Sequence, residues 1–180
     1  MDKRAELLEL VKSTVAVGPV KLASGAISDF YIDGRHTTLT SRGLALTSEL
    51  MWQRIKQWNV TAVGGPTLGA DPIVAGILMA AAREGATLKG FLIRKETKGH
   101  GLGNWVEGPK LAPGERVVLI EDVVTSGGSA ITAINNMRNQ YQPEVVKVLA
   151  LVDRQAGAVE NLSKAGYEFE ALFTRKDLGR

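Results

Sequence analysis

The sequence contains no cysteine, which excludes disulfide bonds and thiolate chemistry and leaves nothing that ties the fold to an oxidising compartment. It also has no apolar run near the ~18 residues of a membrane span. Residues 1–6 are mostly charged and contain no apolar core of a signal peptide. These absences lead us to expect a soluble, cytoplasmic protein with no membrane partner.

The sequence also lacks a large excess of charge of one sign. Its 22 Lys and Arg residues and 19 Asp and Glu residues give a net charge of +3. Without a clustered basic face, so small a surplus does not indicate nucleic-acid binding and better suits a polyanionic small molecule. No repeat, composition shift or linker divides the 180 residues, of which 44% are hydrophobic. We therefore expect one domain over residues 1–180.

The most informative segment begins with an apolar run at residues 117–120. Three of its four residues are β-branched and none is polar, which predicts a strand covered on both faces in a parallel sheet. Glu121 and Asp122 end the run. Two carboxylates at the C-terminal end of such a strand lie where open α/β sheets bind ligands, and they can accept hydrogen bonds from vicinal hydroxyls.

The loop after the acid pair, residues 125–129, has the residue types that a phosphate site needs. Its glycines let the backbone approach closely, its hydroxyls donate, and the helix expected over residues 129–140 points free N–H groups at the loop. The same residue types also serve as ordinary turns and helix caps, and an acid pair often only faces solvent. The loop alone leaves both interpretations open.

The rest of the chain alternates between helical and strand patterns, which predicts an α/β fold. Beyond the segment above, we expect helices over residues 2–15, 41–58, 73–83 and 156–164, strands over residues 61–63, 88–93, 145–152 and 167–173, and a small separate hairpin from residues 20–25 and 28–35.

Two further stretches are candidates for anion binding. Residues 64–72 form a glycine-rich turn in which Asp71 is expected to cap the next helix and Pro72 to be its first residue, although such turns also occur wherever a strand passes tightly to a helix. Residues 94–109 show no periodicity and hold four potentially cationic groups and four glycines. A long loop of this kind is usually functional or disordered, and this one leaves the strand just before the acid-bearing one.

The strand, acid pair and loop of residues 116–129 together resemble the signature of type I phosphoribosyltransferases, which bind 5-phosphoribosyl-1-diphosphate. The resemblance implies a parallel-sheet fold with helices on both faces and a small N-terminal hood, here residues 1–39. It also implies that Glu121 and Asp122 engage the ribose hydroxyls as catalytic residues, and that magnesium is carried by the substrate diphosphate without a certain protein ligand. The residues that take the 5′-phosphate would be Val123, Val124, Thr125, Ser126, Gly127, Gly128 and Ser129.

Within that family, the chain resembles the orotate phosphoribosyltransferases over nearly its whole length. The 94–101 segment is similar to a loop that closes over the diphosphate, often in the partner subunit's site of a homodimer. The contacts implied are Arg94, Lys95, Lys98 and His100, with Lys98 as the catalytic residue that stabilises the departing charge. Arg154 resembles the arginine that grips the base, a planar fork suited to a carboxylate, and Thr125, Tyr31 and Lys21 complete the expected orotate contacts.

Two positions depart from the pattern of these relatives. Many have lysine where this chain has Ala23, and Lys21, two residues earlier on the same strand face, is a candidate substitute. Relatives also often carry Tyr-Lys where this chain has Leu68 and Gly69, so one diphosphate cation is missing.

The reaction implied is transfer of the phosphoribosyl group to orotate, which gives orotidine 5′-monophosphate and diphosphate in pyrimidine biosynthesis. A purine or uracil phosphoribosyltransferase shares the signature but does not need both the cationic loop and Arg154. A regulator that keeps this fold and binds nucleic acid should show a basic face apart from the pocket, and no dense Lys/Arg cluster is present elsewhere.

Overall fold

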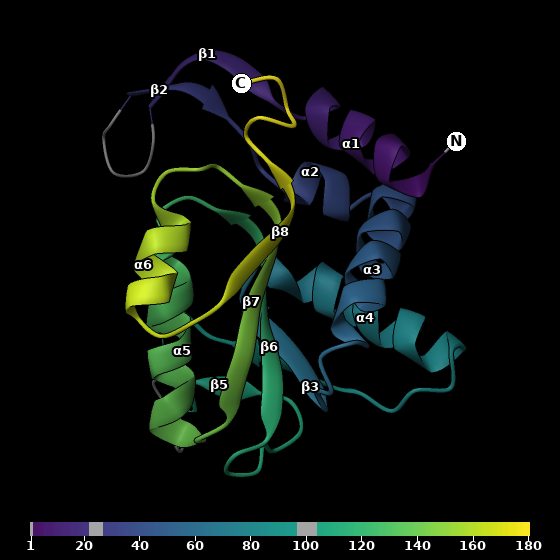
Figure 1. The fold of residues 1–180 in the computed structure, drawn as a ribbon, viewed down its shortest axis with the longest axis vertical. Helices are drawn as coiled ribbons and strands as arrows, with labels where there is room; N and C mark the ends of the chain where they lie inside the picture. The colour runs from purple at the N-terminus through teal and green to yellow at the C-terminus, as the bar shows by residue number, and fades with distance from the viewer. Residues whose placement is uncertain (1, 22–26, 97–103) are drawn as a thin grey trace.

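The structure is a computed structural model of the chain and describes residues 2–21, 27–96 and 104–180. Its centre is a six-stranded sheet of strand order β5-β4-β3-β6-β7-β8, in which only β5 runs antiparallel to its neighbour (Figure 1). The strands are β3 (Ala62–Pro66), β4 (Lys89–Ile93), β5 (Val106–Glu107), β6 (Arg116–Val124), β7 (Glu144–Asp153) and β8 (Phe169–Thr174).

Helices cover both faces of this sheet, as the α/β expectation requires (Figure 1). One face carries α1 (Lys3–Ser13), α3 (Ser41–Ile55) and α4 (Ala70–Arg83), and the other carries α5 (Gly128–Gln140) and α6 (Ala158–Lys164). Within the described residues, no helix has the length and apolar character needed to cross a membrane.

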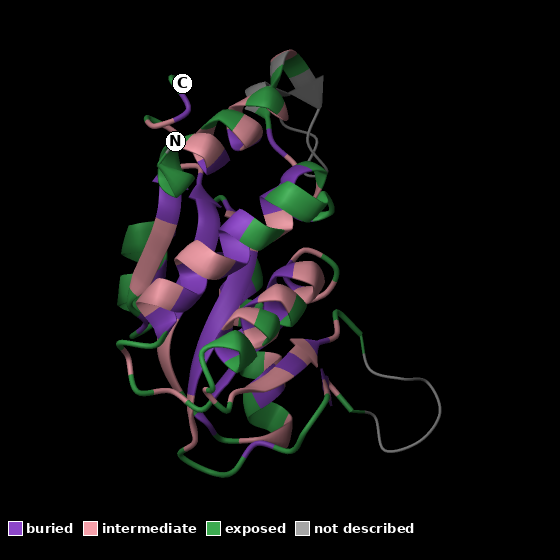
Figure 2. Cartoon of the chain, turned by 90° about the vertical axis from the view of Figure 1, so that its right-hand side faces the viewer, coloured by how far each residue is buried: buried purple, intermediate pink, exposed green. Residues whose placement is uncertain are grey.

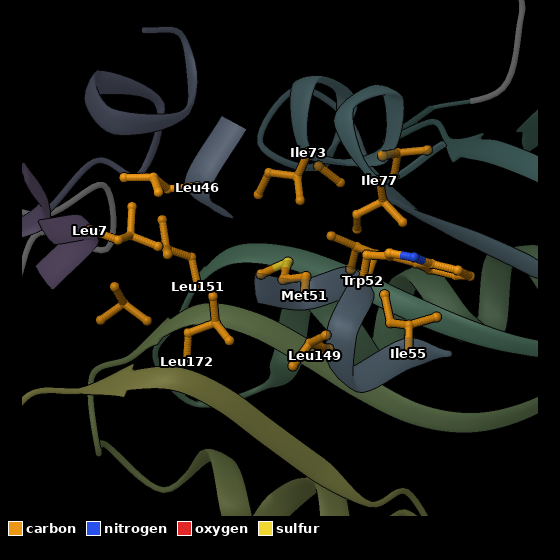
Figure 3. Close-up of a cluster of buried hydrophobic side chains, with 14 of the residues drawn as sticks. Leu7, Leu46, Met51, Trp52, Ile55, Ile73, Ile77, Leu149, Leu151 and Leu172 are labelled. Carbon is orange, nitrogen blue, oxygen red and sulfur yellow. The ribbon is translucent and has the colours of Figure 1, made fainter. Parts of the chain in front are cut away.

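The apolar run of β6 is buried on both sides, as the sequence predicts. Val118 and Ile120 belong to the core beneath α1, α3 and α4, whereas Val117 and Leu119 belong to the core beneath α5 and α6. Successive side chains of a strand point to opposite faces, so a strand between two helical layers needs apolar residues at every position. Figure 3 shows the first core, where Met51, Trp52 and Ile55 of α3 meet Ile73 and Ile77 of α4 over Leu149 and Leu151 of β7. Buried residues follow the sheet and the inner helix faces (Figure 2).

The hood contains a two-stranded antiparallel hairpin outside the main sheet, as expected. Its first strand begins earlier than the predicted residues 20–25, of which residues 22–25 lie outside the described part of the chain. Its strands are β1 (Ala16–Lys21) and β2 (Ile27–Tyr31), and a short helix, α2 (Arg35–Thr38), leads from it to α3. Figure 1 shows the hairpin above the end of the sheet where β7 and β8 terminate.

The prediction that Asp71 caps a helix is wrong. Helix α4 begins at Ala70 after Gly69, and Asp71 lies in its first turn. Gly64 and Gly65 belong to β3 and not to the turn. A Cβ at Gly64 would lie 2.2 Å from the Phe91 carbonyl oxygen, and a Cβ at Gly65 would lie 2.0 Å from the Ile120 carbonyl oxygen. These glycines therefore allow close strand packing, the turn shrinks to residues 67–69, and the helix begins earlier than predicted.

Candidate active site

A cavity of about 340 Å³ opens where β3, β4, β6 and β7 reach their C-terminal ends. Ligands of open α/β sheets bind at this edge. The cavity brings together many of the sequence-predicted site residues, and these predicted residues come from four separate segments of the chain. Its lining consists of Tyr31, Ile32, Asp33 and Arg35 from the hood, Pro66, Thr67, Leu68 and Gly69, Lys95 after β4, Glu121, Asp122, Val123, Thr125 and Ser129, and Arg154 after β7.

A smaller hollow of about 90 Å³ adjoins the cavity over the loop at residues 125–129. Gly127 has a φ of 82°, a left-handed conformation that glycine adopts without strain, and it precedes the first turn of α5. The Asn161 side chain of α6 donates to the Ser126 carbonyl oxygen at 2.9 Å and supports the loop from below. A hollow with hydroxyls and a helix N-terminus is suited to a phosphate group.

The acid pair lies at the centre of the cavity in an environment that opposes ionisation. Burial, reinforced by the neighbouring Asp122 and opposed by Lys95, raises the pKa of Glu121 to about 8. Burial also raises the pKa of Asp122, against the Val123 backbone N–H, which donates to Asp122 Oδ1 at 2.8 Å. Two crowded carboxyls, one buried and one partly buried, are stabilised by a ligand that brings hydroxyl donors or positive charge.

Sequence reasoning missed an ion pair in the wall of this cavity. Arg35 donates from Nε to Asp33 Oδ1 at 2.8 Å and from Nη2 to Asp33 Oδ2 at 2.6 Å. The guanidinium holds the pKa of Asp33 below its usual range, and Asp33 raises the pKa of Arg35. The available signal was an Asp-Gly-Arg sequence directly after a hood strand, where a charged turn would face the sheet edge.

Other predicted contacts lie elsewhere. Arg94 does not line the cavity, and its Nη1 pairs with a carboxylate oxygen of Glu107 at 3.2 Å. Lys98 and His100 lie outside the described residues, as does the side chain of Lys21. Ser126, Gly127 and Gly128 line the smaller hollow with Val124.

Comparison with known proteins decides the family. Residues 38–167 match the phosphoribosyl transferase domain family. The orotate phosphoribosyltransferase of Aquifex aeolicus is 42% identical over 178 residues, which covers 98% of this chain and 96% of that protein. The chain belongs to the orotate phosphoribosyltransferase family. Another member, from Corynebacterium glutamicum strain R, is 41% identical over 180 residues and matches 99% of this chain and 95% of its own.

Solved structures of the orotate phosphoribosyltransferase family share the whole fold. The Mycobacterium tuberculosis enzyme in complex with 5-phospho-α-D-ribosyl 1-diphosphate superposes with a TM-score of 0.82 at 36% identity and 99% coverage of both chains. A phosphoribosyltransferase from Corynebacterium diphtheriae gives 0.85 at 38% identity and full coverage of both. An adenine phosphoribosyltransferase from Thermoanaerobacter pseudethanolicus gives 0.65 at 15% identity, a likeness of fold alone. The α/β fold expected from the signature is confirmed.

Proposed function

We propose that this domain transfers the 5-phosphoribosyl group from 5-phosphoribosyl-1-diphosphate to orotate, forming orotidine 5′-monophosphate and diphosphate. One observation carries the proposal. Glu121 and Asp122 of β6 line the same cavity as Arg154, and a phosphate-sized hollow at residues 125–129 adjoins that cavity. Family membership at about 40% identity supports the same reaction.

The cavity gives each part of the donor a distinct place. The 5′-phosphate occupies the hollow of residues 125–129, and the ribose lies over Glu121 and Asp122, whose oxygens accept from its hydroxyls. The diphosphate then extends toward the 67–69 turn and Lys95, which follow the strands on the other side of β6. Orotate lies toward Tyr31 and Arg154, with its carboxylate on the arginine fork.

The reaction asks mainly for positioning and electrostatic stabilisation. Departure of diphosphate from C1 of the ribose passes through an oxocarbenium-like state, while a ring nitrogen of the orotate anion forms the new bond to C1. The charge of orotate is on its carboxylate, and the attacking ring nitrogen carries a proton, which passes to the departing diphosphate or to water as the N–C1 bond forms. Lys95 in the cavity and Lys98 of the same loop offset the negative charge that develops on the leaving group.

The proposal includes magnesium, which prefers oxygen ligands and commonly rides on substrate phosphates. In the part of the chain that the structure describes, no group of three or more His, Asp or Glu side chains could hold a metal ion. The cavity nevertheless has carboxylate oxygens in Asp33, Glu121 and Asp122. These oxygens fit a cation that is bound by the substrate's diphosphate and by water. When bound, magnesium supplies positive charge to the diphosphate as it departs.

The proposal also includes a homodimer in the cytoplasm, with the loop of residues 94–109 shared between subunits. Helix α4 supports the homodimer, because it has apolar residues on all sides and such a helix is normally buried on all sides. Its Met79 is nevertheless 58% exposed, so this side of α4 is free to pack against a partner. An open groove of about 410 Å³ runs between α3 and α4 beside Met79. On the other flank of α4, Glu107 and Gly108 from the end of the loop line a hollow with Leu78. A partner seated on α4 would therefore lie next to the loop.

Product analysis tests the proposed reaction. Incubating the chain with orotate, the phosphoribosyl donor and magnesium should give orotidine 5′-monophosphate and diphosphate in equal amounts by ³¹P NMR. Diphosphate and free ribose 5-phosphate without a nucleotide would show that water is the acceptor and would contradict the proposal.

A further inference from the structure

Arg35 is a cation that lines the cavity. It has no role in the ribose site at the acid pair or in the phosphate site at residues 125–129. Its side chain is 42% exposed, while the side chain of its partner Asp33 is only 13% exposed. Asp33 also accepts the backbone N–H of Arg35 at 3.0 Å, so the carboxylate holds both the backbone and the guanidinium of the same residue. The guanidinium is therefore fixed before any ligand arrives, which lowers the entropy lost on binding.

The ion pair with Asp33 leaves Arg35 able to bind an anion. A guanidinium carries five N–H donors, and the two contacts to Asp33 use one from Nε and one from Nη2. The remaining donors lie on Nη1 and on the outer edge of Nη2. They form a fork of the kind that binds phosphate and carboxylate groups through two hydrogen bonds.

The location of Arg35 indicates which anion it meets. Glu121 and Val123 line the hollow over residues 125–129, but Asp122, between them in the strand, does not, because alternate side chains point to opposite sides. Asp122 faces the hood, where a Cβ at Gly34 would lie 2.7 Å from Asp122 Cβ and 3.0 Å from its Oδ2. Arg35, next in sequence, therefore lies on the side of the ribose site away from the 5′-phosphate. Gly69, in the turn toward which the diphosphate extends, packs against the same Asp122 carboxylate, since a Cβ there would lie 2.4 Å from Asp122 Oδ1.

We propose that Arg35 binds the diphosphate group of the donor and that Asp33 is its positioning residue. This inference rests on the proposed function, because it takes the donor to lie over the acid pair. Without Asp33, the other acid whose charge acts on Arg35 is Asp122, and an ion pair there would occupy the oxygens that accept from the ribose. Asp33 thus keeps the cation directed at the diphosphate and the Asp122 carboxylate available to the sugar.

Binding of inorganic diphosphate with magnesium, measured by calorimetry, tests the role of Arg35. The matched control is Arg42→Gln, because Arg42 makes the same two-point pair with Glu6, at 2.6 Å for each contact, outside the cavity. We expect Arg35→Gln to weaken diphosphate binding about tenfold or more, Arg35→Lys to weaken it less, and Arg42→Gln to leave it unchanged. The dissociation constant for orotate, measured in parallel, should stay within about twofold of the wild-type value in all three variants.

Asp33→Asn should also weaken diphosphate binding, and the double variant Asp33→Asn/Arg35→Gln should bind no worse than Arg35→Gln, because both changes disable one unit. Unaltered diphosphate affinity in a folded Arg35→Gln protein would overturn the proposal, and so would a loss confined to orotate or an equal loss in Arg42→Gln. Wild-type protein that binds diphosphate but does not convert orotate would refute the proposed function and leave the Arg35 result to stand separately.

Discussion

Gly69 packs directly against the carboxylate of Asp122. A Cβ at Gly69 would lie 2.4 Å from Asp122 Oδ1 and 2.7 Å from its Cγ, distances that real Cβ atoms do not reach. The turn after β3 thus confines one acid of the pair at the end of β6. The placement of Asp122 depends on this glycine.

Gly69→Ala should therefore displace the Asp122 carboxylate and lower kcat/KM for the phosphoribosyl donor about tenfold, or about 1.4 kcal/mol in transition-state stabilisation. Steady-state kinetics with varied donor checks this. Gly114→Ala, outside the cavity lining, is the control for a general loss of stability, because Ala is strained at its φ of 72° but meets no atom within 4 Å. Equal kinetics for wild-type and Gly69→Ala proteins would show that the turn yields and that Asp122 does not need this contact.

The raised pKa of Glu121 makes stability depend on pH. The folded protein holds the Glu121 proton up to a pKa of about 8, whereas the unfolded chain releases it near the ordinary value of 4.5. The contribution of the protonated Glu121 to the free energy of unfolding is therefore full below about pH 4.5 and is lost as pH rises through 8. For this single carboxyl, the loss is at most about 5 kcal/mol.

Denaturant unfolding at pH 5 and pH 8 measures this loss. Because Glu121→Gln removes the titration, its free energy of unfolding should fall less over that interval than the free energy of the wild-type protein. The same fall in both proteins would show that Glu121 is not protonated in the free enzyme near neutral pH.

The exposed face of α4 is expected to join the two subunits. Met79→Glu should give a monomer in sedimentation velocity and lower activity at least tenfold, because a charge in an apolar interface is costly to bury. Val159→Glu on α6 is the control, since Val159 is 55% exposed, close to the 58% of Met79, but lies on the opposite face of the sheet. A Met79→Glu dimer, or a monomer from Val159→Glu, would place the interface elsewhere.

Sharing of the loop can be tested by complementation between two impaired parents. Lys98→Ala should lower turnover by two decades or more with little effect on stability, and Asp122→Asn should lower catalytic efficiency by about one to two decades. In a mixed dimer, the site with Asp122 receives the intact loop of its partner, while the other site has both defects. Activity should reappear on mixing. If subunit exchange is demonstrated and activity stays at the parental level, the loop acts in its own chain.

The parts of the site that a continuous segment encodes were predictable from sequence. Residues 117–129 contain the buried strand, the acid pair and the loop in one run, so periodicity and residue type alone place them. The Asp33–Arg35 pair was not predictable in this way, because its place in the cavity depends on how the hood packs over β6. The glycines at residues 64–65 were misread as a turn, since their reason is the closeness of neighbouring strands, which no local pattern records.

The choice of base tests the central claim most directly. The loss of orotate absorbance with the phosphoribosyl donor and magnesium gives kcat/KM for orotate, and parallel assays give the values for uracil, adenine and hypoxanthine. Arg154 at the cavity wall predicts that orotate exceeds each of the others by about a hundredfold, since a charged hydrogen bond to the carboxylate adds about 1.5–3 kcal/mol and bases without a carboxylate cannot make it. Turnover of a purine or of uracil with none of orotate would contradict the account.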